Sequence, residues 1–299
     1  MKQITRKAYA KINLGLDVLG RRENGYHDVR MIMQTVGIYD ELVLRQRTDS
    51  DIRITANLSD GQTEELACDE HNLIYKAARL VMQECALTQG IDVTLTKNIP
   101  IAAGMAGGST DAAATILGMN DLYGLHLSEA KMCELGVRIG ADVPYCIMGG
   151  TVLAEGIGEI LTRLAPAPQC HLLVVKPQVS VSTAFVYTQL DSREGYDHPD
   201  IDGLMRCMEI QDVSGMAKKL GNVLETVTIP EYPIIRELKE EMLAYGALGA
   251  LMSGSGPTVF GIFETEEHLQ AAYEKMKKRE GVSQTFMTEF VSEATISNQ

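Results

Sequence analysis

The sequence predicts an α+β protein made of two domains. Its 299 residues fit one large domain or two ordinary ones. Candidate strands and helices follow one another along the chain, but not in the regular strand–helix alternation of a doubly wound parallel sheet. This irregular order favours the α+β class over the α/β class. A polar stretch rich in Asp and Gly at 191–203 predicts a loop, and we place the boundary between the domains near residues 156–170.

Apolar patterning places the elements of the first half. It predicts strands at 36–47, 52–56 and 91–96, and helices at 72–86, 109–123 and 128–140. Asn72 and Ser128 are suitable N-caps for the first and third of these helices, because a short polar side chain can accept a hydrogen bond from an unpaired N–H of the first turn.

The second half mixes the same two kinds of element. The pattern predicts strands at 151–154, 171–176, 247–252 and 258–263, and helices at 234–245 and 267–279. The turn SGSGP separates the last two strands.

Composition excludes several classes of protein. With 27 Lys and Arg against 40 Asp and Glu, the net charge is −13, so the chain repels nucleic-acid phosphates and we expect no nucleic-acid partner. No run approaches the roughly 18 apolar residues of a membrane span, and the N-terminus has no apolar signal segment. We therefore expect no membrane association.

Six scattered cysteines, none in a C-x-x-C pair, predict buried free thiols in a reducing compartment, and thus a cytoplasmic protein. Cys68 and His71 are spaced like two metal ligands, but no second pair accompanies them. We expect no metal site formed by the protein alone.

A glycine-rich loop is the most informative local feature. Residues 98–114 read NIPIAAGMAGGSTDAAA, with glycines between the end of a strand and the start of a helix. Such a loop points several N–H groups at one place, and the helix dipole favours an anion there. A glycine-rich turn that binds nothing, with Ser109 or Thr110 as the N-cap of the helix, is an equally simple interpretation of this segment. The loop is neither a Walker A motif nor a Rossmann fingerprint, and the chain lacks protein-kinase motifs.

Three further segments accompany the loop in order. They are AKINLGLDVLGRRENGYHDV (10–29), IGADVPYCIMGGT (139–151) and SGSGPTVFG (253–261). Together with the loop they resemble the GHMP small-molecule kinases, and among these the members that phosphorylate a cytidine diphosphate alcohol. The resemblance spans roughly the first 260 residues.

The resemblance implies a two-domain GHMP kinase fold with the active site in the cleft between the domains. The N-terminal domain would take residues 1–160 and hold the ATP-binding loop, and the C-terminal domain would take 161–299. ATP and Mg²⁺ are the implied cofactors, and a small-molecule cytidine diphosphate alcohol is the implied substrate. We expect a monomer or a weak homodimer.

The ATP-binding residues implied by the resemblance form one continuous loop: Pro100, Ile101, Ala102, Ala103, Gly104, Met105, Ala106, Gly107, Gly108, Ser109 and Thr110. Ala106 departs from the family, which usually has glycine there. If this position needs a positive φ, alanine costs on the order of 1 kcal/mol. Asp111 and the SGSGP turn are expected to shape the pocket.

The implied catalytic pair is Lys11 and Asp142. From the residues alone, Asp142 in GADVPY fits a turn residue as well as a general base. Its place in the motif matches the family's catalytic aspartate. Lys11 matches the family's lysine, and its ammonium beside Asp142 would stabilise the carboxylate and the charge of the transferring phosphoryl group.

The substrate side rests on Tyr26 and His27, in a segment that without the resemblance is a surface turn. In the resembling kinases this segment meets the cytosine ring. Tyr187 would close the other face, Thr183 would lie near the substrate phosphates, and Asn13 would hydrogen-bond in the same site.

Two alternatives stay open at this point. The first is another GHMP kinase, of the homoserine or phosphomevalonate type, although such enzymes have no cytosine to hold. The second is a non-catalytic RNA-associated module, because the N-terminal half of these kinases resembles a fold of ribosomal proteins. The acidity of the chain and the pair Lys11 and Asp142 argue against the second alternative.

Overall fold

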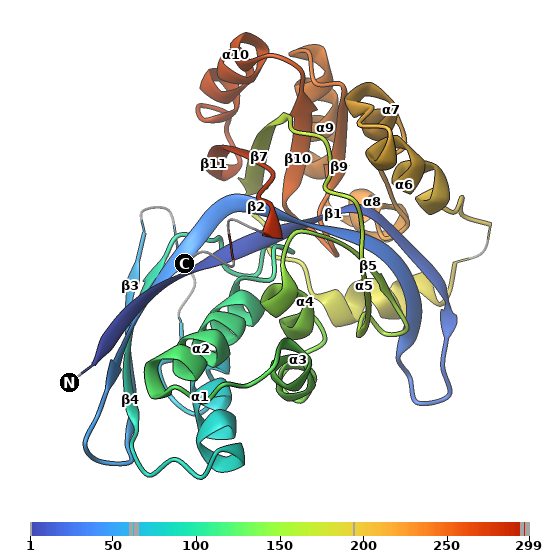
Figure 1. The fold of residues 1–299 in the computed structure, drawn as a ribbon. Helices are drawn as coiled ribbons and strands as arrows, with labels where there is room; N and C mark the ends of the chain where they lie inside the picture. Colours follow the sequence, from blue (N-terminus) through green and yellow to red (C-terminus); the bar gives the residue numbers. More distant parts are fainter. Residues whose placement is uncertain (1, 60–61, 63–65, 194, 294–295, 297–299) are drawn as a thin grey trace.

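Two β-sheets organise the protein, with helices packed against each (Figure 1). The computed structural model describes residues 2–59, 62, 66–193, 195–293 and 296. This mixed two-sheet arrangement confirms the predicted α+β class.

The first sheet is built on a long antiparallel hairpin of two strands, which runs through the middle of the molecule (Figure 1). Its strands are β1 (Gln3–Arg21), β2 (His27–Gln46), β3 (Ile52–Leu58), β4 (Ile91–Lys97), β5 (Thr151–Glu155), β6 (Ile160–Arg163) and β8 (Gly221–Asn222). The order is β3-β4-β2-β1-β8, and β5 pairs with β2 and β6. The hairpin therefore connects the two ends of the sheet.

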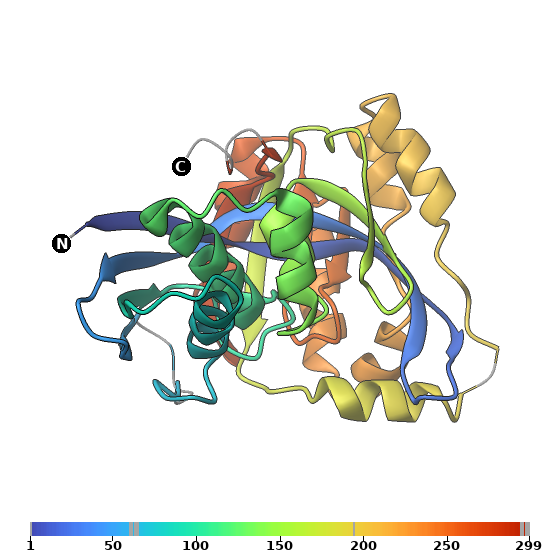
Figure 2. The same ribbon diagram turned by 60° about the horizontal axis from the view of Figure 1, so that its bottom comes forward.

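Four helices gather on one side of this hairpin (Figures 1 and 2). They are α1 (Leu73–Glu84), α2 (Gly107–Tyr123), α3 (Glu129–Val137) and α4 (Val143–Met148). Helices α1 and α2 bury Ile74, Val81 and Ile116 in one apolar cluster with Leu42 and Leu44 of the sheet. This packing fixes the start of α2 relative to the strands.

The second sheet has the order β11-β7-β10-β9, with every pair antiparallel. Its strands are β7 (His171–Pro177), β9 (Gly249–Met252), β10 (Val259–Phe263) and β11 (Val282–Glu289). The helices of this half are α5 (Thr183–Leu190), α6 (Ile201–Glu209), α7 (Val213–Lys218), α8 (Glu225–Glu231), α9 (Ile234–Ala244) and α10 (Glu266–Met276).

The two halves share their core. Ile12 and Leu14 of β1 pack in one cluster with Leu172 and Phe260 of the second sheet. Strand β8, although late in the sequence, pairs with β1 in the first sheet. Strand β6 (Ile160–Arg163) spans the predicted boundary between residues 160 and 161, and the division into 1–160 and 161–299 stays a prediction.

Most predicted elements are confirmed within a few residues, including the caps of α1 and α3, where the side chains of Asn72 and Ser128 each accept a backbone N–H. Three expectations were wrong. The loop expected over 191–203 ends earlier, since α6 begins at Ile201 after the capping Asp200. The second helix begins at Gly107 rather than 109. Of the six cysteines, all expected to be buried, Cys170 and Cys207 are buried, Cys85, Cys133 and Cys146 are partly buried, and Cys68 is exposed.

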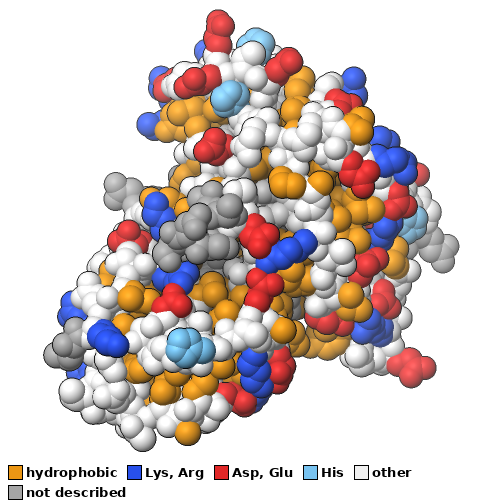
Figure 3. Space-filling model, viewed as in Figure 1, with side chains coloured by type: hydrophobic (Ala, Val, Ile, Leu, Met, Phe, Trp, Pro, Cys, Tyr) orange, Lys and Arg blue, Asp and Glu red, His pale blue; other side chains and the backbone are white. Residues whose placement is uncertain are grey.

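None of the helices in the described ranges combines the length and the apolarity that crossing a bilayer requires. Acidic and basic side chains lie intermingled over the face of the molecule seen in Figure 3.

Candidate active site

A cavity of about 1050 Å³ lies where the glycine-rich loop, the tip of the β1–β2 hairpin and helix α5 meet. Two residues of the expected set, Met105 and Thr110, are not in its lining. The other expected residues line it: Lys11, Asn13, Tyr26, His27, Pro100, Ile101, Ala102, Ala103, Gly104, Ala106, Gly107, Gly108, Ser109, Asp142, Thr183 and Tyr187. Side chains from both halves of the chain thus converge on one hollow.

Helix α2 begins at the cavity without a capping side chain. Its N-cap is Ala106, in the left-handed region at φ 58° and ψ 27°, and alanine has no acceptor to offer the first turn. The N–H groups at Gly107, Gly108 and Ser109 are therefore available to a ligand, and the helix dipole makes this end favourable for an anion. This arrangement suits an anion such as a phosphate group.

Ser109 and Thr110 were both expected among the ATP-binding residues of the loop. Ser109 lines the cavity. Thr110 is buried and donates its hydroxyl to the backbone oxygen of Tyr9 over 2.7 Å. Met105 is buried in the core, and its carbonyl accepts the backbone N–H of Lys11 over 3.2 Å. The loop is therefore tied to β1 at both of these positions.

Gly104 is the loop position where a side chain would meet the hardest obstacle. Its φ is +73°, and a Cβ there would lie 2.3 Å from the backbone oxygen of Ser253. The Ser253 hydroxyl donates to the Gly104 carbonyl over 2.9 Å. The SGSGP turn was expected to shape the pocket. It lies in the second half of the chain and packs against the glycine-rich loop at Gly104.

Lys11 lies on β1 where the pairing with β2 is irregular. The register shifts between Tyr9 and Lys11 and again between Asn13 and Gly15, as is common beside active sites. The side chain is 5% exposed, and its ammonium donates to the Asn13 side-chain oxygen over 2.7 Å and to the Gly104 carbonyl over 3.4 Å. The cation is thus held between the loop and the rest of the cavity.

Asp142 occupies the N-cap position of α4, but its side chain does not cap the helix. Within the described part of the chain, no hydrogen bond or ion pair engages its carboxylate, and Lys11 donates to Asn13 and Gly104 instead of to Asp142. The direct contact between Lys11 and Asp142 that the sequence predicted is therefore absent from the described part of the chain, although both side chains line the same cavity. The carboxylate is left available to a substrate.

The opposite end of the cavity carries aromatic side chains. Tyr26, at the hairpin tip, is 60% exposed. The rings of His27 and Tyr187 lie 4.9 Å apart, tilted by 40°. Burial raises the pKa of Tyr187 to about 12, and the Asp142 carboxylate adds to the rise. Tyr187 is therefore neutral at ordinary pH and near the candidate base.

Comparison with known proteins identifies the family. The model of the GHMP kinases N terminal domain matches residues 72–150, and that of the GHMP kinases C terminal matches 194–282. The chain belongs to the GHMP kinases. It is an ATP-dependent small-molecule kinase, and its two-domain fold is the GHMP kinase fold that the resemblance implied.

Close relatives of this GHMP kinase share one name. The 4-diphosphocytidyl-2-C-methyl-D-erythritol kinase of Lachnospira eligens is 52% identical over 289 residues, covering 97% of this chain and 99% of the relative. That of Clostridium perfringens is 47% identical, covering 96% and 98%. A crystal structure of 4-(cytidine 5'-diphospho)-2C-methyl-D-erythritol kinase matches with a TM-score of 0.81 and 30% identity, covering 96% of this chain and 99% of that one.

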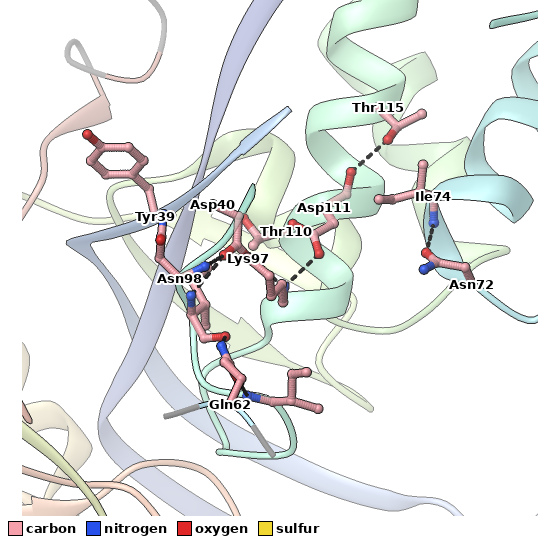
Figure 4. A network of polar contacts seen from close by, with 12 residues as sticks. Tyr39, Asp40, Gln62, Asn72, Ile74, Lys97, Asn98, Thr110, Asp111 and Thr115 are labelled. Carbon is pink, nitrogen blue, oxygen red and sulfur yellow. Dashed lines mark hydrogen bonds and ion pairs between the residues drawn. The ribbon is translucent and has the colours of Figure 1, made fainter. Parts of the chain in front are cut away.

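A buried charge cluster beside the loop of this GHMP kinase was missed by the sequence reasoning. The Lys97 ammonium lies 2.5 Å from an oxygen of Asp40 and 2.6 Å from one of Asp111 (Figure 4). The other Asp40 oxygen accepts the backbone N–H groups of Asn98 and Ile99. The other Asp111 oxygen is buried without a hydrogen-bond partner in the described part of the chain.

Burial raises the pKa of Asp111 well above its usual range, and Lys97 opposes this rise. Burial alone would lower the pKa of Lys97, but the carboxylates of Asp111 and Asp40 raise it. Lys97 and Asp111 both line the cavity. The cluster therefore holds Lys97 between two acidic side chains beside the start of α2, so that its charge is balanced within the protein.

A signal for this cluster exists in the sequence. Lys97 follows Ile91, Val93 and Leu95 at alternate positions of β4, so a charged residue occupies the buried face of the strand. Asp40 stands at the matching inward position of the neighbouring strand, between Ile38 and Leu42. Opposite charges at inward positions of adjacent strands indicate a buried ion pair.

Proposed function

We propose that this GHMP kinase transfers the γ-phosphoryl group of ATP to the 2-hydroxyl of 4-diphosphocytidyl-2-C-methyl-D-erythritol, a step that yields an isoprenoid precursor. The named relatives, about half identical over nearly the whole chain, support this substrate. The observation that carries the proposal is the two-ended cavity, which has an anion-binding end at α2 and an aromatic end at the hairpin tip.

The two ends suit the two substrates. The uncapped N–H groups of α2 and the Lys11 ammonium beside the loop suit the phosphates of ATP. Tyr26, His27 and Tyr187 suit a cytosine ring, because aromatic side chains stack on a base at about 1–3 kcal/mol per base. A substrate that lacks a nucleobase, such as homoserine, would leave this second end unfilled.

Asp142 is the proposed general base. The acceptor oxygen forms a bond to the γ-phosphorus while the bond from that phosphorus to the β–γ bridging oxygen breaks, and ADP leaves. The proton of the hydroxyl passes to the Asp142 carboxylate, which has no partner of its own in the described chain. Asp142 lines the same cavity as Tyr187 and the loop, which fits this role.

Lys11 is proposed to stabilise charge on the transferring group. Asn13 and the Gly104 carbonyl hold its ammonium beside the loop.

Mg²⁺ bound with ATP would neutralise charge on the β- and γ-phosphates. Ser109 lines the cavity with an oxygen donor, the chemistry that Mg²⁺ prefers, and the metal ordinarily keeps several phosphate and water ligands as well. The cytoplasmic location and the monomeric or weakly dimeric state stay predictions.

The proposal is tested by a coupled assay of ADP release. The purified kinase is given ATP, Mg²⁺ and, in separate reactions, 4-diphosphocytidyl-2-C-methyl-D-erythritol, homoserine and phosphomevalonate. Turnover is expected with the cytidine substrate and at most trace turnover with the others. A preference for either of the other two alcohols would refute the proposed substrate without touching the family assignment.

A further inference from the structure

Asp191 joins three parts of the acceptor end of the cavity, and neither the sequence motifs nor the family match points to it. It is the C-cap of α5. One carboxylate oxygen lies 2.6 Å from Nε2 of His27, and the other lies 3.3 Å from Nη1 of Arg21. Both partners belong to the hairpin formed by β1 and β2, so the carboxylate fastens the hairpin tip to α5.

The contact with Asp191 controls what His27 can offer a ligand. A carboxylate accepts hydrogen bonds, so Nε2 carries the hydrogen and, in the neutral ring, Nδ1 is the remaining acceptor. The same contact holds the ring 4.9 Å from that of Tyr187. The His27 side chain is 10% exposed and that of Asp191 is 26% exposed. The pair is thus enclosed enough to have a defined geometry.

We propose that Asp191 is a positioning residue for the acceptor substrate, which sets the tautomer and the orientation of His27 against Tyr187. This inference rests on the proposed function, because the acceptor is taken to be a cytidine diphosphate alcohol. Asp191 itself acts through His27 and through the placement of the hairpin tip. Its loss should weaken binding of the acceptor and leave the ATP end unchanged.

A second carboxylate offers a matched control. Asp202, in α6, accepts from Arg30 of β2 over 2.6 Å, so it also ties the hairpin to a helix of the second half. Asp202 does not line the cavity and does not contact His27. A purely structural effect of fastening the hairpin should therefore appear in both variants, and a positioning effect only in the first.

The experiment compares wild type, Asp191→Asn, Asp191→Glu and Asp202→Asn. Steady-state kinetics give kcat and separate KM values for the acceptor and for ATP, and thermal unfolding checks folding. We expect Asp191→Asn to raise the acceptor KM about tenfold with the ATP KM unchanged, the scale of a lost charge-assisted hydrogen bond. Asp191→Glu should restore part of the loss, and Asp202→Asn should behave as wild type.

A second measurement reports on His27 directly. Nitrogen-15 NMR of the ring distinguishes the Nε2–H from the Nδ1–H tautomer. The wild type should show Nε2–H, and Asp191→Asn should show a mixture. Equal acceptor KM in Asp191→Asn and wild type, or equal losses in Asp191→Asn and Asp202→Asn, would overturn the inference.

The two proposals fail in different ways. If the wild type does not phosphorylate the cytidine substrate, the proposed function fails, and the ring spectra then decide the positioning role alone. Unchanged His27 signals in Asp191→Asn overturn that role, and a shifted tautomer supports it.

Discussion

Two clusters of charged side chains flank the cavity, and they differ in how they are held. Asp40, Lys97 and Asp111 are buried, with side chains at most 4% exposed. Asp191 and its partner Arg21, at the hairpin tip, have side chains that are 26% and 59% exposed. A buried pair is costly to break, whereas an exposed pair contributes little to stability. The first cluster should therefore govern folding, and the second should govern ligand geometry.

The largest expected effect follows from breaking the buried cluster. Lys97→Met removes the ammonium and leaves the side chains of Asp40 and Asp111 in the interior without their shared partner. We expect a loss of about 3–5 kcal/mol in the free energy of unfolding, measured by urea titration. The matched control is Arg21→Met at the exposed cluster, which should stay within about 0.5 kcal/mol of wild type. Similar losses of unfolding free energy in both variants would contradict the proposal that only the buried cluster governs folding.

The pH dependence of the same cluster has a definite sign. The folded state raises the pKa of Asp111 above its unfolded value, mainly through burial. The contribution of Asp111 to stability is thus present at pH values below the unfolded pKa and is lost as pH rises through the folded pKa. Wild type should lose stability relative to Asp111→Asn as the pH is raised. The opposite trend would mean that Asp111 is ionised and held by Lys97.

The second effect concerns the candidate base, Asp142, which lines the same cavity. Asp142→Asn keeps the shape and removes the base, so kcat should fall by about 10²-fold or more with little change in substrate affinity. Lys11→Met should also lower kcat. Because the two residues serve one transition state, the double variant should be little worse than the worse single variant. Steady-state and single-turnover kinetics measure these changes.

A loss smaller than about fivefold in Asp142→Asn would contradict the general-base role, since a positioned base usually contributes far more. The phosphate oxygens would then take the proton, and Asp142 would only orient the alcohol.

The difference between the clusters also explains what the sequence could predict. The loop, Lys11 and Asp142 lie in continuous motifs, and the resemblance of these motifs to the GHMP kinases predicted that they share one site. Lys97 and Asp40 were detectable from inward positions on adjacent strands. Asp191 and His27 are 164 residues apart in the sequence, and no local sequence pattern predicts a contact between residues so far apart.

Strand β1 was missed although the sequence carries a signal for it. Ala10, Ile12, Leu14, Leu16 and Val18 stand at alternate positions, with Lys11, Asn13 and Asp17 between them, and such a period of two indicates a strand. The polar residues are buried as well, because the centre of β1 is covered on both faces. The start of α2 was misplaced because Ser109 is the better N-cap by residue type, whereas the backbone of Ala106 begins the helix.

A smaller effect is expected at the exposed end of the cavity. Tyr26→Ala should raise KM for the cytidine substrate by about tenfold, because stacking on a base is worth about 1–3 kcal/mol. The ATP KM and the free energy of unfolding should not change, since Tyr26 is 60% exposed and contributes little to the core. An equal rise in the ATP KM would place Tyr26 in the nucleotide end instead.

The smallest expected effect belongs to the residue that departs from the family. Ala106 has φ 58°, a conformation that costs a residue with a Cβ on the order of 1 kcal/mol and costs glycine almost nothing. Glycine also makes the unfolded chain more flexible, which offsets part of this gain. Ala106→Gly should therefore raise the free energy of unfolding by at most about 1 kcal/mol, with the ATP KM unchanged.

Gly104→Ala provides the opposite test within the same loop. Its φ is also positive, but its Cβ would meet the Ser253 oxygen at 2.3 Å, so both stability and ATP binding should suffer. If Ala106→Gly lowered stability, the loop would not hold position 106 at positive φ. The two substitutions therefore separate two effects in one loop. Ala106→Gly relieves backbone strain, whereas Gly104→Ala creates a clash with the Ser253 backbone.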